Sequence, residues 1–445
     1  MNSERQYIEL YGQTKQFIDN GSHALINAHR QQALEQLEAQ GLPTSKNERY
    51  KYIDVAEAFA PDYGLNLRRM KMEADPGAAY RCSVPNLDSV LYYVFNDKVV
   101  AKDGNTLDTD RLFVGSLVDF AANRPEEFNK YYNKFVGDGL VALNTLLAQD
   151  GVVVWIGDGY KCEKTIQILN LTLGNVAMMT NRRVLIVVGK GAEASLLVCD
   201  HSLTKESHLV SEVAEIVVAE DAVLHLCSIE ETGETNKMFR STNIVQHCRS
   251  KLSYTDVTLN NGLTRHTLNL HLAGEKAEAC VSGLVVGGGT QHADSDLLIS
   301  HEACCCKSDV LYKSVLDGSS TGSFAGKVYV APGAQKSESQ ETNSNLCVSP
   351  NAHAYTRPML EIYADDVKCN HGSTVGRLDE SALFYMAQRG VDPTEGRRLL
   401  QQAFACEVIE RIELPSLRTR LHQMIEERFR RGSGACGDCV LCASK

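Results

Sequence analysis

Between residues 151 and 375, short apolar runs alternate with short polar corners, and one small buried-type residue closes each corner. Taking that small residue as a marker gives a series: Ala192, Ala222, Ser250, Ala277, Cys306 and Ala334. Successive markers lie 30, 28, 27, 29 and 28 residues apart. A near-constant period of this size is typical of a solenoid, in which each coil buries its apolar face against its neighbours.

The repeats consist of strand-like runs and tight corners, with no helical pattern between the markers. This favours a mainly β fold, a parallel β-helix, over residues 151–375. Residues 362–367 look like a last, displaced copy, because Val367 lies 33 residues after Ala334. The end coil of a solenoid leaves backbone N–H and C=O groups unpaired, so we expect it to be capped or to pair with another chain.

Helical regions are expected on both sides of the solenoid. Residues 1–150 are predicted to be mostly helical, with one strand at 90–95. Residues 376–432 form a second helical region, in which a short helix ends before Gly390. Asp392, followed by Pro393, has the sequence of an N-cap and first helical residue.

A thiol and an imidazole lie two residues apart at the end of the predicted solenoid, at Cys369 and His371. In an extended segment the side chains of residues i and i+2 project from the same face, so these two could share one metal ion or one partner surface. A buried cysteine followed by a histidine at a turn is an equally ordinary structural arrangement. The spacing leaves both interpretations open.

Other cysteines and acidic residues are weaker candidates for metal sites. Adjacent residues of a strand point to opposite faces, so we predict a structural role for Cys304, Cys305 and Cys306. The alternating set His292, Asp294, Asp296 and His301 is interpreted as a solvated corner. At the terminus, residues 433–445 form a cysteine-rich tail. In it, C-x2-C-x2-C supplies only three thiolates for zinc or a cluster: Cys436, Cys439 and Cys442.

Composition and short motifs narrow the range of possible functions. The chain has 45 Lys and Arg against 56 Asp and Glu, a net charge of -11 that argues against nucleic acid or an anionic membrane as the main partner. No signal peptide or apolar span is apparent, so we expect a cytoplasmic protein whose 15 cysteines are mostly free thiols. Gly322–Lys327 lacks the spacing of a phosphate loop, and no nucleophile motif is present, so we predict no enzymatic activity.

Residues 363–376 and 383–390 resemble the C-terminal signature of the SufD family, scaffold subunits of the SUF iron–sulfur cluster assembly machinery. Shorter matches upstream extend the resemblance over most of residues 265–412. The related SufB family has a Glu-His-Glu type sequence where this chain has residues 369–371. Tyr50 stands where the SufD family usually has Trp.

The resemblance implies a right-handed parallel β-helix that pairs with a SufB-type scaffold and binds a SufC-type ATPase through its C-terminal helices. It also implies a transient iron–sulfur cluster at the scaffold interface, with His371 as the first candidate ligand and Cys369 as the second. Four apolar residues of the helical tail are candidates for partner binding and, equally, for the packing of the tail itself: Leu399, Leu400, Phe404 and Val408.

Two other functions remain open at this point. A SufB-like subunit could hold its own cluster in a homo-oligomer. A β-helix enzyme that acts on carbohydrate is the second alternative, which the helical tail and the absence of an export signal disfavour.

Overall fold

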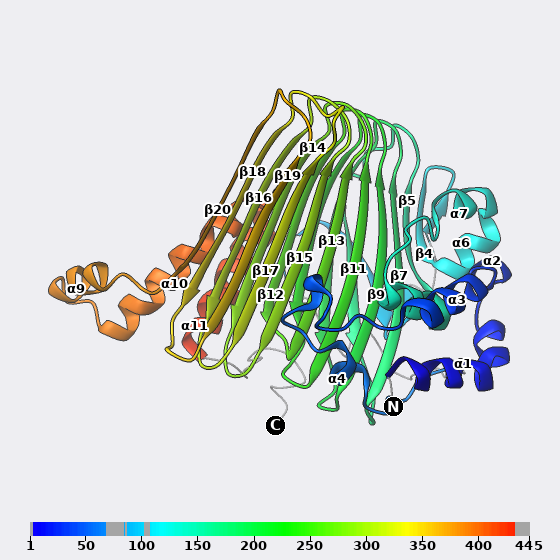
Figure 1. The fold of residues 1–445 in the computed structure, drawn as a ribbon, viewed down its shortest axis with the longest axis horizontal. Coiled ribbons are helices and arrows are strands. Elements are labelled where there is room, and N and C mark those ends of the chain that lie inside the picture. Colours follow the sequence, from blue (N-terminus) through cyan, green and yellow to red (C-terminus); the bar gives the residue numbers. More distant parts are fainter. Residues whose placement is uncertain (1–2, 68–83, 85–86, 102–106, 432–445) are drawn as a thin grey trace.

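The computed structural model describes residues 3–67, 84, 87–101 and 107–431. Their dominant feature is a solenoid of two facing ten-stranded sheets, which share an apolar core between them (Figure 1). From β5 and β6 onward, every strand pairs in parallel with the equivalent strand of the next coil. The structure therefore confirms the predicted parallel β-helix with flanking helices.

One sheet, here called sheet B, has the spatial order β2-β1-β6-β8-β10-β12-β14-β16-β18-β20. Its strands are β1 (Ser89–Phe95), β2 (Lys98–Ala101), β6 (Thr165–Thr172), β8 (Glu193–Ser202), β10 (Val223–Glu231), β12 (Lys251–Asn260), β14 (Glu278–Gly287), β16 (Lys307–Leu316), β18 (Glu338–Cys347) and β20 (Lys368–Gly376).

The other sheet, sheet A, has the order β19-β17-β15-β13-β11-β9-β7-β5-β4-β3. Its strands are β3 (Leu107–Thr109), β4 (Leu112–Ser116), β5 (Gly151–Ile156), β7 (Met178–Val188), β9 (His208–Val218), β11 (Asn236–Gln246), β13 (Leu263–Leu272), β15 (His292–His301), β17 (Thr321–Val330) and β19 (His353–Ile362).

The corners that lead from sheet A to sheet B explain the sequence period. Each small marker residue is buried at the point where a strand of sheet B begins, and the amide of Ala222, for example, donates to the carbonyl of Ala219 at 3.1 Å. The residue before the marker adopts a left-handed backbone conformation, with φ of 59° at Asp221. A large side chain at the marker would not fit beneath this turn, so the repeat keeps a small residue there.

One marker differs from the prediction. The corner between β17 and β18 spans residues 331–337. Ala334 is buried there and its amide donates to the carbonyl of Ala331 at 2.9 Å, as at the other markers, but the buried residue directly before the strand is Ser337. Lys336, with φ of 60°, takes the left-handed position. With Ser337 as the marker, Val367 follows after 30 residues and is in register, not displaced. The longer corner hid this regularity in the sequence.

The N-terminal region contributes both helices and strands. Its helices are α1 (Ser3–Asn20), α2 (Ala24–Asn27), α3 (Arg30–Gln40), the 3-10 helix η1 (Glu48–Tyr50), α4 (Val55–Phe59), α6 (Leu117–Asn123), α7 (Pro125–Tyr131) and α8 (Gly139–Leu147). Helix α8 packs on β7 and β9 of sheet A. The strands β1 to β4 extend the two sheets beyond the predicted start of the solenoid at residue 151.

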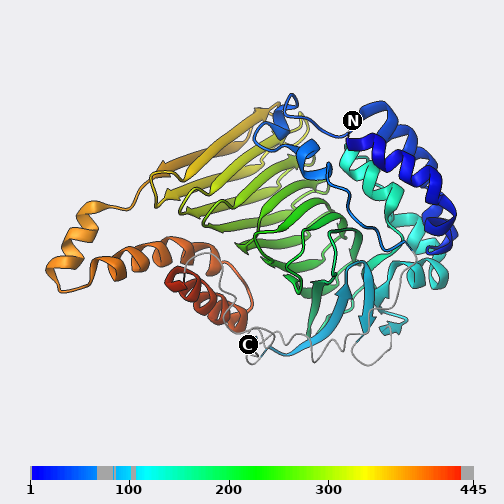
Figure 2. The same cartoon turned by 90° about the horizontal axis from the view of Figure 1, so that it is seen from below.

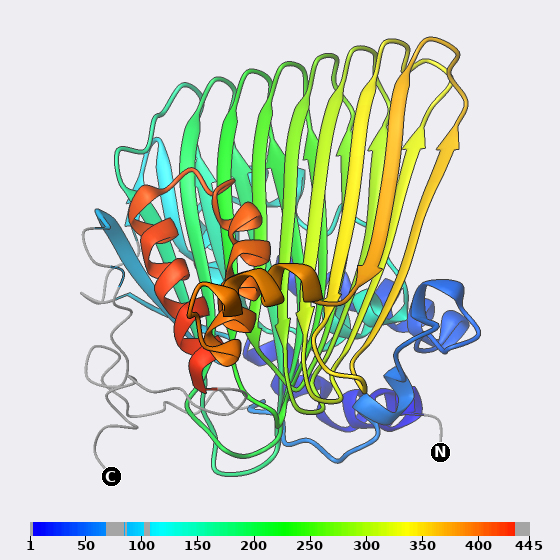
Figure 3. The same cartoon turned by 90° about the vertical axis from the view of Figure 1, so that its left-hand side faces the viewer.

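The C-terminal region, as far as the structure describes it, is an arm of three helices, α9 (Glu380–Gln388), α10 (Pro393–Ile409) and α11 (Pro415–Arg431). Asp392 caps α10 as predicted, since its carboxylate accepts from the amides of Thr394 and Glu395. Helix α10 contacts β14 and β16 of sheet B, on the opposite side of the solenoid from α8, whereas α9 projects away from the body (Figures 2 and 3).

Within the described residues, β19 and β20 are the last strands of their sheets, and we call this the open end of the solenoid. Most of β20 is exposed. The prediction that residues 362–376 form the end coil is therefore confirmed. Among the described helices, none is both long and apolar enough to cross a membrane.

Candidate functional site

The open end brings the predicted thiol and imidazole to one face of β20. Cys369 lies beside Ser339, and His371 lies beside Glu341, in the parallel register of β18 and β20. Ser339 and Glu341 are both buried inside the solenoid, so Cys369 and His371 belong to the inward-facing row of side chains. Asn370, between them, lies on the outer face and lines a groove there.

The two residues differ in environment. Cys369 is half-buried against the apolar core, and burial raises the pKa of its thiol. His371 is exposed, because no further strand of the described chain covers it. Both side chains are iron ligands in chemical type. The part of the chain that the structure describes contains no cluster of three or more His, Cys, Asp or Glu that could hold a metal ion.

The inner row of β18, directly beneath β20, is polar up to its last residue, Cys347. Its polar members are Ser339, Glu341, Asn343 and Asn345. The neighbouring strand β16 places the apolar Val310 and Leu316 in the corresponding row. Glu341 was not among the residues expected from the sequence, although the two-residue spacing of these polar side chains along a predicted strand was a usable signal. Strand alternation places all four on one face, and their burial makes that face the inner one.

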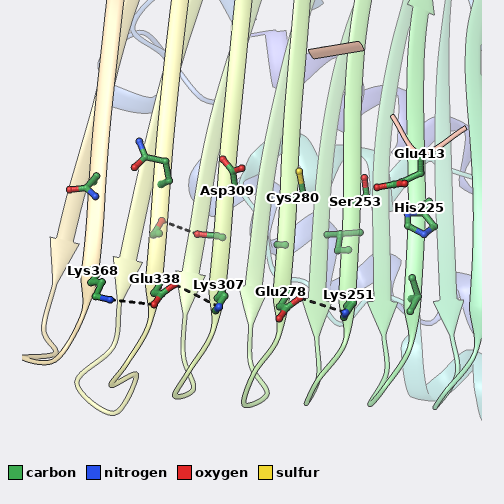
Figure 4. A pocket seen from close by; sticks show the side chains of 17 residues that line it. His225, Lys251, Ser253, Glu278, Cys280, Lys307, Asp309, Glu338, Lys368 and Glu413 are labelled. Carbon is green, nitrogen blue, oxygen red and sulfur yellow. Dashed lines mark hydrogen bonds and ion pairs between the residues drawn. The ribbon is translucent and has the colours of Figure 1, made fainter. Parts of the chain in front are cut away.

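The outer face of sheet B carries a groove of about 760 Å³ that ends at Lys368 and Asn370 of β20. Its floor alternates lysine and glutamate at the strand starts, and Glu338 lies 3.7 Å from Lys307 and 3.8 Å from Lys368 (Figure 4). Glu413, from the loop before α11, reaches into the groove from the C-terminal arm. The alternating charges neutralise one another, so the groove has no strong preference for a charged ligand.

The other metal-site candidates from the sequence lie in turns or in buried ion pairs of the fold. Cys304 and Cys305 lie in the turn before β16, not on a strand, and the thiol of Cys306 donates to the carbonyl of Gly274 at 3.2 Å. The solvated-corner interpretation of residues 292–301 is wrong, because these residues form β15. Asp294 and Asp296 are buried there as ion-pair partners of Arg265. The sequence around Asp294 and Asp296 does not reveal this pairing, because Arg265 lies on another strand, β13.

The four apolar candidates of α10 occupy different environments. Leu400 and Phe404 are half-buried in a cluster with Leu378, Val315 and Leu346, and Val408 is fully buried in a cluster that joins α10 and α11 to sheet B. Leu399 is 39% exposed.

Cys436, Cys439 and Cys442 lie outside the residues that the structure describes, so their proposed metal site stays a prediction.

Comparison with known proteins matches nearly the whole chain. A family model described as "SUF system FeS cluster assembly, SufBD core domain" matches residues 171–404, and a second, "SufBD protein N-terminal region", matches residues 1–168.

Several individual proteins are also similar to this chain over most of its length. An iron-sulfur cluster assembly SufBD family protein of Synechocystis is 28% identical over 94% of this chain and 95% of its own length. The iron-sulfur cluster assembly protein SufD of Escherichia coli is 26% identical over 91% of this chain and 93% of its own length. The chloroplastic protein ABCI7 of Arabidopsis thaliana is 26% identical over 70% of this chain and 66% of its own length.

Proposed function

Since the chain belongs to the SufBD family of SUF iron–sulfur cluster assembly proteins, we propose that it is a cytoplasmic, non-catalytic scaffold subunit of the SufD type. In this proposal it pairs with a SufB-type scaffold through the open end of its solenoid and binds a SufC-type ATPase through its C-terminal arm.

The observation that carries the pairing proposal is the exposed end coil. Strands β19 and β20 are the last in their sheets within the described chain, and neither is covered by the C-terminal arm, which packs on β14 and β16. An exposed strand edge offers backbone N–H and C=O groups that a strand of another chain can pair with. A second solenoid with a similar open end would satisfy these groups and continue the sheets.

His371 and Cys369 are the residues that we expect to face the iron or the growing cluster at this interface. The imidazole needs no conformational change to reach a partner, because it is already exposed on β20. The thiol is half-buried and burial disfavours its thiolate, so it would become a ligand after a local rearrangement. His371 and Cys369 would supply two ligands, which is consistent with a cluster whose remaining ligands come from the other scaffold.

The C-terminal arm has features of a docking element. On α9, which contributes no buried residue, Phe384 is 66% exposed and Tyr385 is 56% exposed. Leu399 of α10 is exposed as well. Leu400, Phe404 and Val408 would act indirectly, by fixing the arm on sheet B. An exposed apolar helix face of this kind suits a helix-in-groove contact with an ATPase subunit.

A carbohydrate-acting enzyme is poorly supported by the groove on sheet B. Such chemistry needs a pair of carboxylates in different protonation states. In the groove, Glu278 and Glu338 are instead exposed and lie within 3.8 Å of lysines.

The test is anaerobic co-expression of the chain with SufB-type and SufC-type subunits from the same organism, followed by native mass spectrometry. We expect one stable complex that contains all three. A chain that purifies alone contradicts the proposal. An iron-bearing homo-oligomer that excludes the second scaffold would favour the SufB-like alternative.

A further inference from the structure

One carboxylate inside the open end lacks the partner that its neighbours have. On the inner row of β18, Ser339 bonds to Ser308 at 2.8 Å, Asn343 donates to the carbonyl of Tyr312 at 3.2 Å, and Asn345 donates to that of Thr374 at 3.1 Å. Glu341 is 1% exposed, yet neither carboxylate oxygen has a hydrogen-bond partner among the described residues.

The fold makes room for this carboxylate. Across the core, β17 has Gly326 opposite Glu341, and a Cβ atom at that position would lie 2.3 Å from the Oε1 atom of Glu341. Any side chain at position 326 would therefore displace the carboxylate. On the inward side Glu341 lies beside Val310, which is apolar, and on the outward side it lies beside His371. Of the two strands that pair with β18, only β20, at the open end, places a polar residue beside Glu341.

Folding alone does not explain such a residue. Burial without compensating contacts costs free energy and raises the pKa of Glu341 to about 7. A leucine or glutamine at this position would be less costly to bury. The hydroxyl of Thr356, on the neighbouring edge strand β19, is likewise buried without a hydrogen-bond partner among the described residues. A buried polar group without a hydrogen-bond partner calls for an explanation, and a bound ion is one of those that native proteins offer.

We propose that Glu341 is a further iron ligand of this chain, in addition to His371 and Cys369, and that it supplies a carboxylate oxygen to the ferrous ion that His371 holds at the open end. The inference rests on the proposed function, because it takes iron as the cargo of the scaffold. Ferrous iron accepts imidazole nitrogen and carboxylate oxygen together, and a neutral imidazole with one carboxylate leaves positions for sulfide, water or the second scaffold. Binding would also compensate the buried negative charge.

The inference is tested by ferrous iron binding to the full chain, measured anaerobically by equilibrium dialysis at pH 7.5. We compare the wild type with Glu341→Gln, His371→Ala and the control Glu338→Gln. Glu338 lies on the same strand but on the outer face, where it pairs with lysines. We expect one ion per wild-type chain, at least tenfold weaker binding for Glu341→Gln and for His371→Ala, and wild-type binding for Glu338→Gln.

The outcomes separate the inference from the proposed function. If His371→Ala loses iron and Glu341→Gln binds as the wild type does, the role of Glu341 is overturned while that of His371 stands. A wild-type chain that binds no iron, or a His371→Ala variant that binds normally, overturns the shared site. If Glu341→Gln weakens only the pairing with the second scaffold in native mass spectra, the carboxylate serves a partner side chain, and the iron inference is again overturned.

A folding control accompanies the binding measurement. Thermal unfolding of metal-free Glu341→Gln is expected to be no lower than that of the wild type, because the substitution removes a buried charge and keeps the side-chain shape. Weakened iron binding in a variant of unchanged thermal stability is therefore a loss of the ligand. A markedly lower unfolding temperature would show that Glu341 has a structural partner and would overturn the inference.

Discussion

The middle and the open end of the solenoid treat buried charge in opposite ways. In the middle coils, Arg240 lies 2.6 Å from Asp200, 2.8 Å from Glu212 and 3.4 Å from Asp256, and all four side chains are inside the fold. A second arginine, Arg182, shares two of these acids, Asp200 and Glu212. At the open end, the buried Glu341 has no ion-pair or hydrogen-bond partner among the described residues.

The contrast separates two uses of polar residues in one core. Several opposite charges in mutual contact compensate the cost of desolvation, so the middle network is compatible with a permanently closed interior. A lone carboxylate has no such compensation and makes sense where another molecule arrives. The middle coils therefore support the fold, and the last coils supply the function that we propose.

The largest expected effect comes from breaking the middle network. Arg240→Leu leaves three buried carboxylates without their shared cation and should lower the free energy of unfolding by about 3–5 kcal/mol. The control is Arg5→Leu, which removes an exposed arginine 2.9 Å from Glu9 on α1 and should change stability by less than about 0.5 kcal/mol. Urea denaturation measures both. Equal effects would show that the buried network contributes no special stability.

Acid should lower the free energy of unfolding through a buried histidine of the middle coils. His208 is buried beside Arg182, and burial lowers the pKa of its imidazole to about 4. The folded state therefore binds fewer protons than the unfolded state between pH 4 and 6.5, and stability is lost as the pH falls through this window.

From pH 7 to pH 5 this histidine should account for roughly 2 kcal/mol of the loss. In His208→Gln the difference in unfolding free energy between the two pH values should shrink by that amount. An unchanged difference would assign the acid sensitivity to other groups.

Removing the lone carboxylate should have a smaller effect, of opposite sign. In metal-free protein at pH 8, Glu341→Gln is expected to raise the free energy of unfolding by about 1 kcal/mol, because an unpaired buried charge becomes neutral. Its neighbour on the same inner row provides the contrast. Asn343→Ala removes satisfied hydrogen bonds and should destabilise by about 1–3 kcal/mol. If both variants lost stability alike, the two residues would have the same structural role.

Much of the fold could be predicted from local sequence. The period of the small corner residues predicted the repeat of the solenoid coils, because each corner needs a small residue beneath a left-handed turn. Residues 362–376 were identified as the end coil, and Asp392 with Pro393 as a helix start, since caps and turns depend on few neighbouring residues. The position of Cys369 and His371 on one face followed from strand alternation.

What could not be predicted depends on contacts between distant residues. Asp294 and Asp296 were interpreted as a solvated corner because Arg265, their partner, lies on another coil. The marker Ala334 has the burial and the turn of the other markers, but it lies three residues before the residue that precedes its strand, because this corner is longer than the others. Glu341 was missed because its isolation is defined by the glycine opposite it, at Gly326, and by the absence of nearby donors among the described residues.

We propose that the open end, and His371 in particular, holds iron during cluster assembly. The most direct measurement is the iron and sulfide content of the anaerobically reconstituted three-subunit complex with wild-type chain and with His371→Ala. We predict complexes of the same composition and native mass, with cluster formation reduced several-fold in the variant. Unchanged cluster formation in His371→Ala would contradict the account.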